Sequence, residues 1–370
     1  MLRTRSPHSS SSSAPQADAL AADRVVLVDA GDGEALYERS LADRWGDGLP
    51  LLAPTEARVR RLIDATPWHA DDVVCVLPPE HREATIELVA INAAMAGVAP
   101  EGFPYLIAAL EAISEPSHNL YGLTTTTSSV IPMLVVNGPS RDRAGIDYGP
   151  GCMGGAAGRG SSTIGRALSL CLRNIGGQRV GDTSKSVFGQ PARVSGLCFG
   201  EWEERSPWPS LATQWGYPAD ADVVTVHGGK GTMPVADVNC DDARDLLFLI
   251  AKSMAFPLSN KFLTPISGNG QTVIALNPMW AERFGREFPD VDDCKAFLHE
   301  HAWQPIGSWP EKNQAVLHAK DRVDADGRVF LNERPDQFVL VVCGGLGNLH
   351  AVALPSWGDS EIAHRRVVWP

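Results

Sequence analysis

Apolar residues recur along the chain in two alternating patterns, one with the spacing of helices and one with the continuous runs of buried strands. Helical spacing covers 83–97, 103–113, 162–177, 241–254 and 291–302. Continuous apolar runs cover 73–77, 131–139, 221–229, 272–278 and 337–345. Because the two patterns alternate, we expect an α/β fold with mixed or largely parallel sheets covered by helices, and with glycine-rich loops at the strand ends.

Polar residues mark where two of the predicted helices begin, one of them shorter than those above. Thr55 is expected to cap a helix that starts at Glu56. Either Ser161 or Ser162 is expected to cap the helix at 162–177, which closes on a pair of glycines.

The first 22 residues differ from the rest, since they are rich in serine and carry no sustained apolar pattern. We expect 1–22 to be a disordered tail. The remaining 23–370 form the expected α/β catalytic region, either as one large domain or as two subdomains at about 23–215 and 216–370.

Composition limits the classes of partner. The formal net charge is −12, from 32 Lys and Arg against 44 Asp and Glu, and no Lys/Arg cluster supplies the basic face that nucleic acids need. No apolar run approaches the length of about 18 residues that spans a bilayer. We therefore expect neither a nucleic-acid nor a membrane partner. Seven widely spaced cysteines without a CxxC pair fit reduced thiols and a cytoplasmic location.

The sequence carries no signature of a common cofactor. The phosphate-binding pattern GxxxxGK[ST] is absent, and GxGxxG does not fit in register. No HExxH motif or Cys/His cluster argues for zinc, so we expect no metal site and leave the cofactor undefined.

A glycine-dense loop at 145–162 precedes one predicted helix. Glycine lets backbone N–H groups turn toward a ligand, and a helix start attracts negative charge. The loop therefore predicts a site for a carboxylate or phosphate, and a tight structural turn is the alternative. The substrate-binding residues expected here are Gly154, Gly155, Arg159, Ser162 and Arg166.

Two further features precede or end the strand at 131–139. The hydroxyl side chains of Thr124, Thr125, Thr126 and Thr127 suit a polar ligand, although a threonine-rich strand edge would carry the same residues. Asn137 stands at the strand end, where ligands bind in open α/β sheets.

Candidate catalytic groups lie in three places. Glu201, Glu203 and Glu204 stand among tryptophans, which would raise a carboxyl pKa for acid/base work; a solvated acidic face is the alternative. Cys152 lies in the glycine loop, where a helix start and Arg159 would lower its pKa; an incidental loop cysteine is the alternative.

Three histidines at turns are candidate bases, and His350 is the one we carry forward. The other two are His118 and His227. Cys343 ends an apolar strand and is expected to be a core residue.

Six sequence blocks, in order across about 43–358, together resemble the UGSC family, which is named for a selenocysteine/cysteine–Gly–Ser–Cys motif. The resemblance implies kinship with selenoprotein subunits of the glycine and proline reductase type, and redox or carbon–heteroatom chemistry on small molecules. This chain departs from the family because it contains no C-G-x-C sequence. The blocks are DGLPLLAPT, EATIELVAINAAMAGVAPEGFPYLIAALEAI, LVVNGP, STIGRALSLCLRNIGG, GEWEERSPWPSL and VVCGGLGNLHAVALPSWG.

These observations favour an enzyme, alone or as a subunit of a two-component system, of the oxidoreductase or lyase type. It would cleave or form a carbon–heteroatom bond in a small carboxylate-bearing molecule of a biosynthetic pathway. The alternatives are a non-catalytic partner of a separate CGSC-bearing thiol or selenol protein, and a small-molecule binding protein. We also expect homo-oligomerisation, because catalytic pockets often form between subunits.

Overall fold

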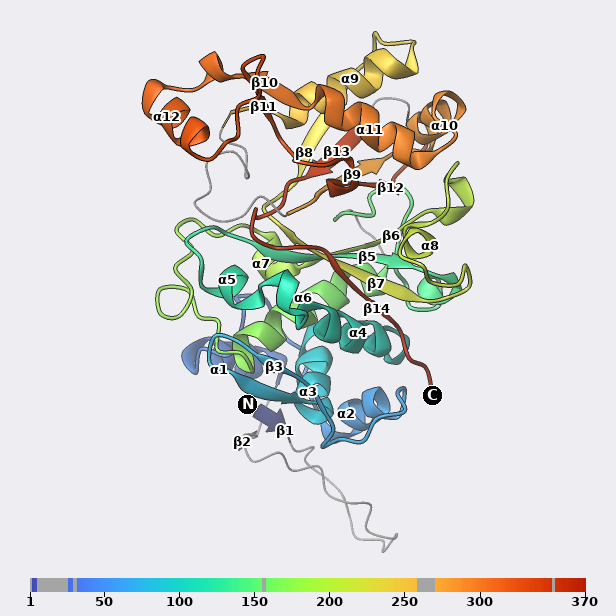
Figure 1. Ribbon diagram of the computed structural model, residues 1–370. Helices are drawn as coiled ribbons and strands as arrows, with labels where there is room; N and C mark the ends of the chain where they lie inside the picture. Colours follow the sequence, from blue (N-terminus) through green and yellow to red (C-terminus); the bar gives the residue numbers. More distant parts are fainter. Residues whose placement is uncertain (1, 5–25, 29–31, 155–157, 258–269, 348–349) are drawn as a thin grey trace, which may run out of the picture.

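The computed structural model describes residues 2–4, 26–28, 32–154, 158–257, 270–347 and 350–370 (Figure 1). Most of the expected disordered tail lies outside these ranges, and so does Gly155. The exception is β1 (Leu2–Thr4), which pairs in parallel with β2 (Val26–Val28).

The protein is a mixed α/β structure with several small mixed sheets packed with helices. Two four-stranded sheets form its centre, in the strand orders β14-β7-β5-β6 and β12-β9-β13-β8. Each has one parallel and two antiparallel pairs, so the sheets are mixed rather than largely parallel. The strands are β5 (Ile131–Asn137), β6 (Leu197–Gly200), β7 (Val223–Gly229), β14 (Ala363–Arg366), β8 (Met233–Ala236), β9 (Thr272–Leu276), β12 (Phe338–Val342) and β13 (His350–Leu354).

The two sheets lie one above the other, with helices on both outer sides (Figure 1). Alternate side chains of a strand point to opposite faces. Met133 of β5 therefore packs in the layer between the sheets with Val273 of β9, whereas Leu134 packs against helices. Because β5, β7, β9 and β12 are buried on both faces, their sequences read as continuous apolar runs rather than alternating ones.

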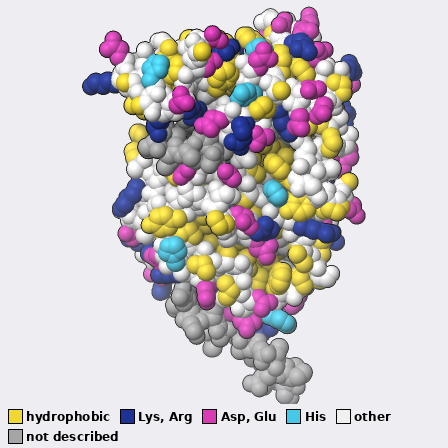
Figure 2. Space-filling model, in the orientation of Figure 1, with side chains coloured by type: hydrophobic (Ala, Val, Ile, Leu, Met, Phe, Trp, Pro, Cys, Tyr) yellow, Lys and Arg dark blue, Asp and Glu magenta, His cyan; other side chains and the backbone are white. Residues whose placement is uncertain are grey.

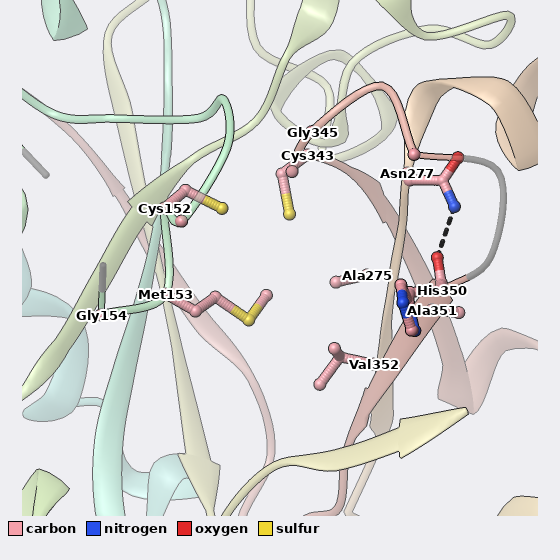
Figure 3. Close-up of a pocket in the computed structure, with 13 residues that line it drawn as sticks. Cys152, Met153, Gly154, Ala275, Asn277, Cys343, Gly345, His350, Ala351 and Val352 are labelled. Carbon is pink, nitrogen blue, oxygen red and sulfur yellow. Dashed lines mark hydrogen bonds between the residues drawn. The ribbon is translucent and has the colours of Figure 1, made fainter. Parts of the chain in front are cut away.

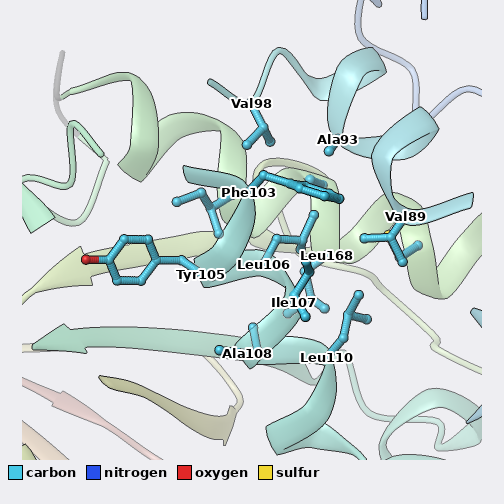
Figure 4. Close-up of a cluster of buried hydrophobic side chains, with 14 of the residues drawn as sticks. Val89, Ala93, Val98, Phe103, Tyr105, Leu106, Ile107, Ala108, Leu110 and Leu168 are labelled. Atoms are coloured by element: carbon cyan, nitrogen blue, oxygen red, sulfur yellow. The ribbon is translucent and has the colours of Figure 1, made fainter. Parts of the chain in front are cut away.

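Three helices cover the outer face of the first sheet. Helix α4 lies against β7 and β14, α6 lies against β6, and α3 packs on α6. Figure 4 shows the apolar cluster that they share, with Phe103, Leu106 and Leu168 in contact range of one another. These helices are α3 (Ile86–Ala96), α4 (Phe103–Ile113) and α6 (Arg159–Asn174); α1 (Gly33–Ala42), α2 (Glu56–Ile63) and the hairpin β3 (Val73–Leu77) and β4 (Arg82–Thr85) lie beyond them.

A second group of helices covers the outer face of the other sheet (Figure 1). Trp280 and Phe284 are fully buried there against Leu276 and Leu340. The group consists of α9 (Ala243–Met254), α10 (Pro278–Glu287) and α11 (Val291–His301), with α12 (Glu311–Ala319), β10 (Trp303–Pro305) and β11 (Arg328–Phe330) at its edge.

Short helices make the remaining connections. They are α5 (Leu120–Thr125), α7 (Ala192–Ser195), α8 (Leu211–Gln214), and the 3-10 turns η1 (Pro100–Gly102), η2 (Pro116–His118), η3 (Pro139–Arg141), η4 (Glu203–Arg205), η5 (Ile306–Ser308) and η6 (Pro335–Gln337).

The two central sheets repeat one connectivity. In the first sheet, β5 is followed by α6 and by β6, which pairs with β5 in parallel, and the next strand, β7, pairs antiparallel with the other edge of β5. In the second sheet, β9, β12 and β13 are connected in the same way, with β9 in the place of β5. The sequence shows no repeat, because different side chains fill the two copies. The repeat makes Glu201, after β6, equivalent to Cys343, after β12: their N–H groups donate to the carbonyls of Val136 and Leu276, both at 2.9 Å.

Most predicted elements are observed, and two boundaries differ. Thr55 caps α2 as expected, accepting from the N–H of Arg58. Helix α6 begins at Arg159 after Gly158, so neither serine caps it. The predicted helix at 83–97 begins three residues later, at Ile86, because the preceding residues pair with β3.

The surface mixes charges of both signs. On the face in Figure 2, Lys and Arg side chains are scattered among Asp and Glu rather than gathered in one field. Within the described ranges, no helix combines the length and the apolar character needed to cross a bilayer.

Candidate functional site

A cavity of about 350 Å³ opens at the carboxyl ends of β9 and β12, where a loop from the first sheet lies against the second (Figure 3). A cavity of this size is large enough for a small ligand. Thiol groups, an imidazole, an amide and apolar side chains line it together with glycine backbone. The lining residues are Gly151, Cys152, Met153, Gly154, Ala275, Asn277, Cys343, Gly344, Gly345, Gly347, His350, Ala351 and Val352.

Cys152 is held by a compact turn in the loop between β5 and α6. Its N–H donates to the carbonyl of Gly149 at 3.2 Å, and Gly154 donates to Gly151 at 3.1 Å. Gly151 and Gly154 have φ values of 79° and 132°, which favour glycine because a side chain would be strained there. The glycines of this loop therefore shape the turn that presents the thiol.

The same loop is joined to the end of β12. The N–H of Gly344 donates to the carbonyl of Tyr148 at 2.7 Å, and a Cβ on Gly345 would lie 3.4 Å from Pro150. These contacts bring Cys152 beside Cys343, and both side chains face the cavity (Figure 3).

The two thiols differ in acidity. A hydrogen bond with Cys343 lowers the pKa of Cys152 below its ordinary value, helped by the Gly344 N–H and opposed by burial. The same hydrogen bond, burial and the charge of Glu201 raise the pKa of Cys343 well above its ordinary value. Cys152 is therefore the thiol that ionises first. The largest cause of the lowered pKa is Cys343, a residue that the sequence suggested only for the core.

Behind the thiols lies a buried acidic network at the carboxyl end of the first sheet. The Asn137 amide donates to Glu201 at 2.6 Å and to Glu203 at 3.1 Å, and the N–H of Leu211 donates to Glu201 at 2.8 Å. Burial raises the pKa of Glu201 from 4.5 to about 7, although these hydrogen bonds oppose it. The structure thus brings Asn137, Glu201 and Glu203 together.

Glu204 has a different environment. It forms an ion pair with Arg141 at 2.5 Å, and its side chain is 63% exposed whereas that of Arg141 is 3% exposed. The Arg141 guanidinium lies 4.5 Å from the ring centre of Tyr148 and 3.5 Å from Glu203. Desolvation raises the pKa of Glu204, but its hydrogen bonds and the charge of Arg141 together outweigh this effect, so the pKa lies below its ordinary value. Glu203 and Glu204 therefore anchor Arg141 and stand outside the cavity lining.

The start of α6 has protein partners in place of a ligand. The N–H groups of Gly160 and Ser161 donate to the carbonyl of Gly145 at 2.8 and 3.3 Å. A Cβ on Gly158 would lie 2.3 Å from that same oxygen, so glycine is needed for the close approach. These contacts match the structural-turn alternative, because they use two of the N–H groups at the start of α6 that an anion would need.

The two arginines expected to bind an anion also have protein partners. Arg166 pairs with the buried Asp47 at 2.8 Å and donates to the carbonyl of Pro50 at 3.0 Å. The Nε of Arg159 donates to the carbonyl of Gly97 at 2.8 Å. Neither lines the cavity that holds Cys152.

The threonine run forms the end of a helix rather than a strand edge. Thr124 and Thr125 lie in α5 and donate to the carbonyls of Leu120 and Tyr121. Thr126 follows the helix and accepts from the N–H of Ser128, while the carbonyl of Thr127 accepts from Val187. All four stand outside the cavity lining.

Among the histidines, His350 alone lines the cavity within the described residues. It is exposed at the start of β13, and its carbonyl accepts from the Asn277 amide (Figure 3). His118 is buried with Nδ1 2.9 Å from the Glu361 carbonyl, and burial lowers its pKa to about 4. His227 is buried with Nε2 2.9 Å from the Leu354 carbonyl.

A second cavity of about 430 Å³ adjoins the first and shares Cys152, Met153 and Gly154 with it. Its lining is more polar, with Ser161, Ser162, Gln190, Ser195 and Thr232. Ser162 therefore lies beside the site, although its hydroxyl donates to Gly158 at 3.3 Å. Together the cavities give Cys152 an apolar side and a hydroxyl-rich side.

Within the part of the chain that the structure describes, no three His, Cys, Asp or Glu side chains are grouped so that they could hold a metal ion. Comparisons with protein-family models, with curated proteins and with solved structures found no match to this chain.

Sequence reasoning missed Cys343 and Asn277 as site residues. Both end apolar runs, and the equivalent ends of the first sheet were recognised at Asn137 and Glu201. The signal was therefore the position of each residue directly after a buried strand.

Proposed function

We propose that the protein is an enzyme that cleaves or forms a carbon–heteroatom bond in a small molecule, with the Cys152 thiolate as its nucleophile. The observation that carries the proposal is the placement of a thiol with a lowered pKa at the junction of two cavities. Thiolates rather than thiols are nucleophilic, and such cysteines mark reactive sites.

The reaction begins with attack of the thiolate on an electrophilic carbon. The electron pair of the broken bond leaves with the heteroatom, and His350, which lines the same cavity, supplies its proton. His350 then takes a proton from water, whose oxygen attacks the same carbon; the bond to Cys152 breaks, and its electron pair returns to the thiolate. The Gly344 N–H and the Cys343 thiol stabilise negative charge on Cys152 before the attack.

The cavity linings favour a substrate with two distinct parts. Met153, Ala275 and Val352 suit an apolar reacting end, whereas Ser195 and Thr232 suit a hydroxyl-bearing or amide-bearing remainder. Arg159 and Arg166, which the sequence suggested for a substrate carboxylate, are engaged elsewhere. We therefore assign recognition to neutral hydrogen-bonding groups.

Labelling with iodoacetamide tests the nucleophile without a known substrate. We expect Cys152 to react first, with an apparent pKa below that of a free cysteine, as read by peptide mass spectrometry over pH 5–10. Cys198 and Cys294 serve as internal controls, because burial raises the pKa of each to about 12. Equal or slower labelling of Cys152 would contradict the assignment.

Release of a leaving group tests the activity. Purified protein is incubated with small neutral thioesters and carboxylic esters, whose acyl groups water can remove from Cys152, and the released thiol or alcohol is measured. We expect at least one to be turned over by the wild type and none by Cys152→Ala. A reactive Cys152 without any turnover would favour the binding-protein or partner-subunit alternative.

A further inference from the structure

We propose that Cys152 and Cys343 form a redox pair, which oxidises reversibly to an intramolecular disulfide by exchange with small uncharged disulfides. The inference goes beyond the proposed carbon–heteroatom chemistry and rests on the same reactive Cys152. It adds Cys343, which the sequence suggested only as a core residue, to the chemistry of the site.

The pair is built by tertiary structure. Cys343 is fixed at the end of β12 by its N–H bond to Leu276, while Cys152 belongs to the loop that follows β5. The two side chains line one cavity and belong to one buried cluster (Figure 3). A disulfide requires the two cysteines to approach side chain to side chain, and the two thiols face the same space from the two sheets.

The other cysteines of the described residues lack this arrangement. Cys198 and Cys294 are buried in separate apolar clusters, and Cys171 of α6 is fully buried near Cys75. Cys198 lines only the second cavity, and none of Cys75, Cys171, Cys240 and Cys294 lines either cavity. A small disulfide that enters the cavity therefore meets Cys152 and Cys343.

The difference in acidity between the two thiols sets the order of events. The Cys152 thiolate attacks one sulfur of R–S–S–R, forms Cys152–S–S–R and releases R–S⁻. That thiolate takes the proton of Cys343, and the resulting Cys343 thiolate attacks Cys152 sulfur. The second R–S⁻ leaves and takes up a proton from water. This proton replaces the one that Cys152 lost to water when it ionised. In total, two protein thiols become one disulfide, and R–S–S–R becomes two R–SH.

The cavity also indicates the class of disulfide. Its apolar side chains and its glycine backbone suit a small uncharged molecule, and the net charge of −12 repels an anionic one. We therefore expect bis(2-hydroxyethyl) disulfide to react at least about tenfold faster than the dianionic 3,3′-dithiodipropionate.

The test uses the full chain. Reduced protein is treated with bis(2-hydroxyethyl) disulfide, quenched in acid, alkylated and mapped by mass spectrometry without reduction. We expect a peptide pair joined through Cys152 and Cys343, which dithiothreitol separates again. Cys343→Ala should stop at a mixed disulfide on Cys152, Cys152→Ala should form neither product, and Cys240→Ser, the control outside both cavities, should form the cross-link as the wild type does.

Two outcomes would overturn the proposal. One is a wild-type protein that keeps a stable mixed disulfide on Cys152, and the other is a cross-link that involves a different cysteine. Since the wild-type map decides both, a variant that fails to fold does not obscure the answer. Iodoacetamide labels Cys152 without Cys343, so normal labelling with no cross-link refutes the redox pair alone, whereas lost labelling refutes the proposed function as well.

Discussion

The buried carboxyl of Glu201 gives the sharpest quantitative prediction. Its side chain is 1% exposed and accepts hydrogen bonds from Asn137 and Leu211. Replacing it with glutamine keeps its size and removes the ability to ionise. The variant Glu201→Gln therefore isolates the cost of a buried negative charge.

The magnitude follows from the shifted pKa. Burial raises the pKa of Glu201 from 4.5 to about 7, and each pH unit of difference corresponds to about 1.36 kcal/mol, so the whole difference is about 3 kcal/mol. The unfolded chain releases this proton at lower pH than the folded protein. Wild-type stability therefore falls as pH rises from about 4.5 through about 7, and about 2 kcal/mol of this loss lies between pH 5 and pH 8.

Urea unfolding at pH 5, 6, 7 and 8 measures the effect. We expect the free energy of unfolding of Glu201→Gln minus that of wild type to increase by about 2 kcal/mol from pH 5 to pH 8. Glu204→Gln is the control, and its difference from wild type should stay constant between pH 5 and pH 8. Because the pKa of Glu204 is lowered from 4.5, its contribution is fully present in this range and declines only in more acidic solution. Parallel curves for wild type and Glu201→Gln would refute a raised pKa for this carboxyl.

Two further predictions concern residues whose expected roles the structure replaces or explains. Arg166→Ala should cost about 2 kcal/mol of stability, because Asp47 loses its guanidinium partner and keeps only the Leu49 N–H, while iodoacetamide labelling of Cys152 stays unchanged; slower labelling would restore a role for Arg166 at the site. Gly138→Ala should cost at least about 2 kcal/mol, because a Cβ would lie 2.5 Å from Asp222 at a φ of 103°. Gly181→Ala, at a φ of 83° in open space, should cost only about 1 kcal/mol. Urea unfolding measures both glycine variants, and equal losses of stability would exclude the steric explanation.

Part of the site could be read from the sequence because strand ends are visible as breaks in apolar runs. Asn137, Glu201 and Cys152 each follow or precede such a break, and the structure brings the first two into direct contact. The arginines could not be assigned in this way. An arginine one turn into a helix looks available for a ligand until a distant acidic residue such as Asp47 is known to reach it.

The sequence by itself determined the longer helices and the buried strands such as β5 and β9, because apolar periodicity and caps such as Thr55 act over a few neighbouring residues. It did not predict the less buried strands β8 and β14. Only the tertiary structure decided that the loop carrying Cys152 meets the end of β12, and that the Gly145 carbonyl occupies the start of α6. The physical reason is that these contacts depend on how two sheets stack. The side chains between the sheets define that stacking jointly, and no local pattern encodes it.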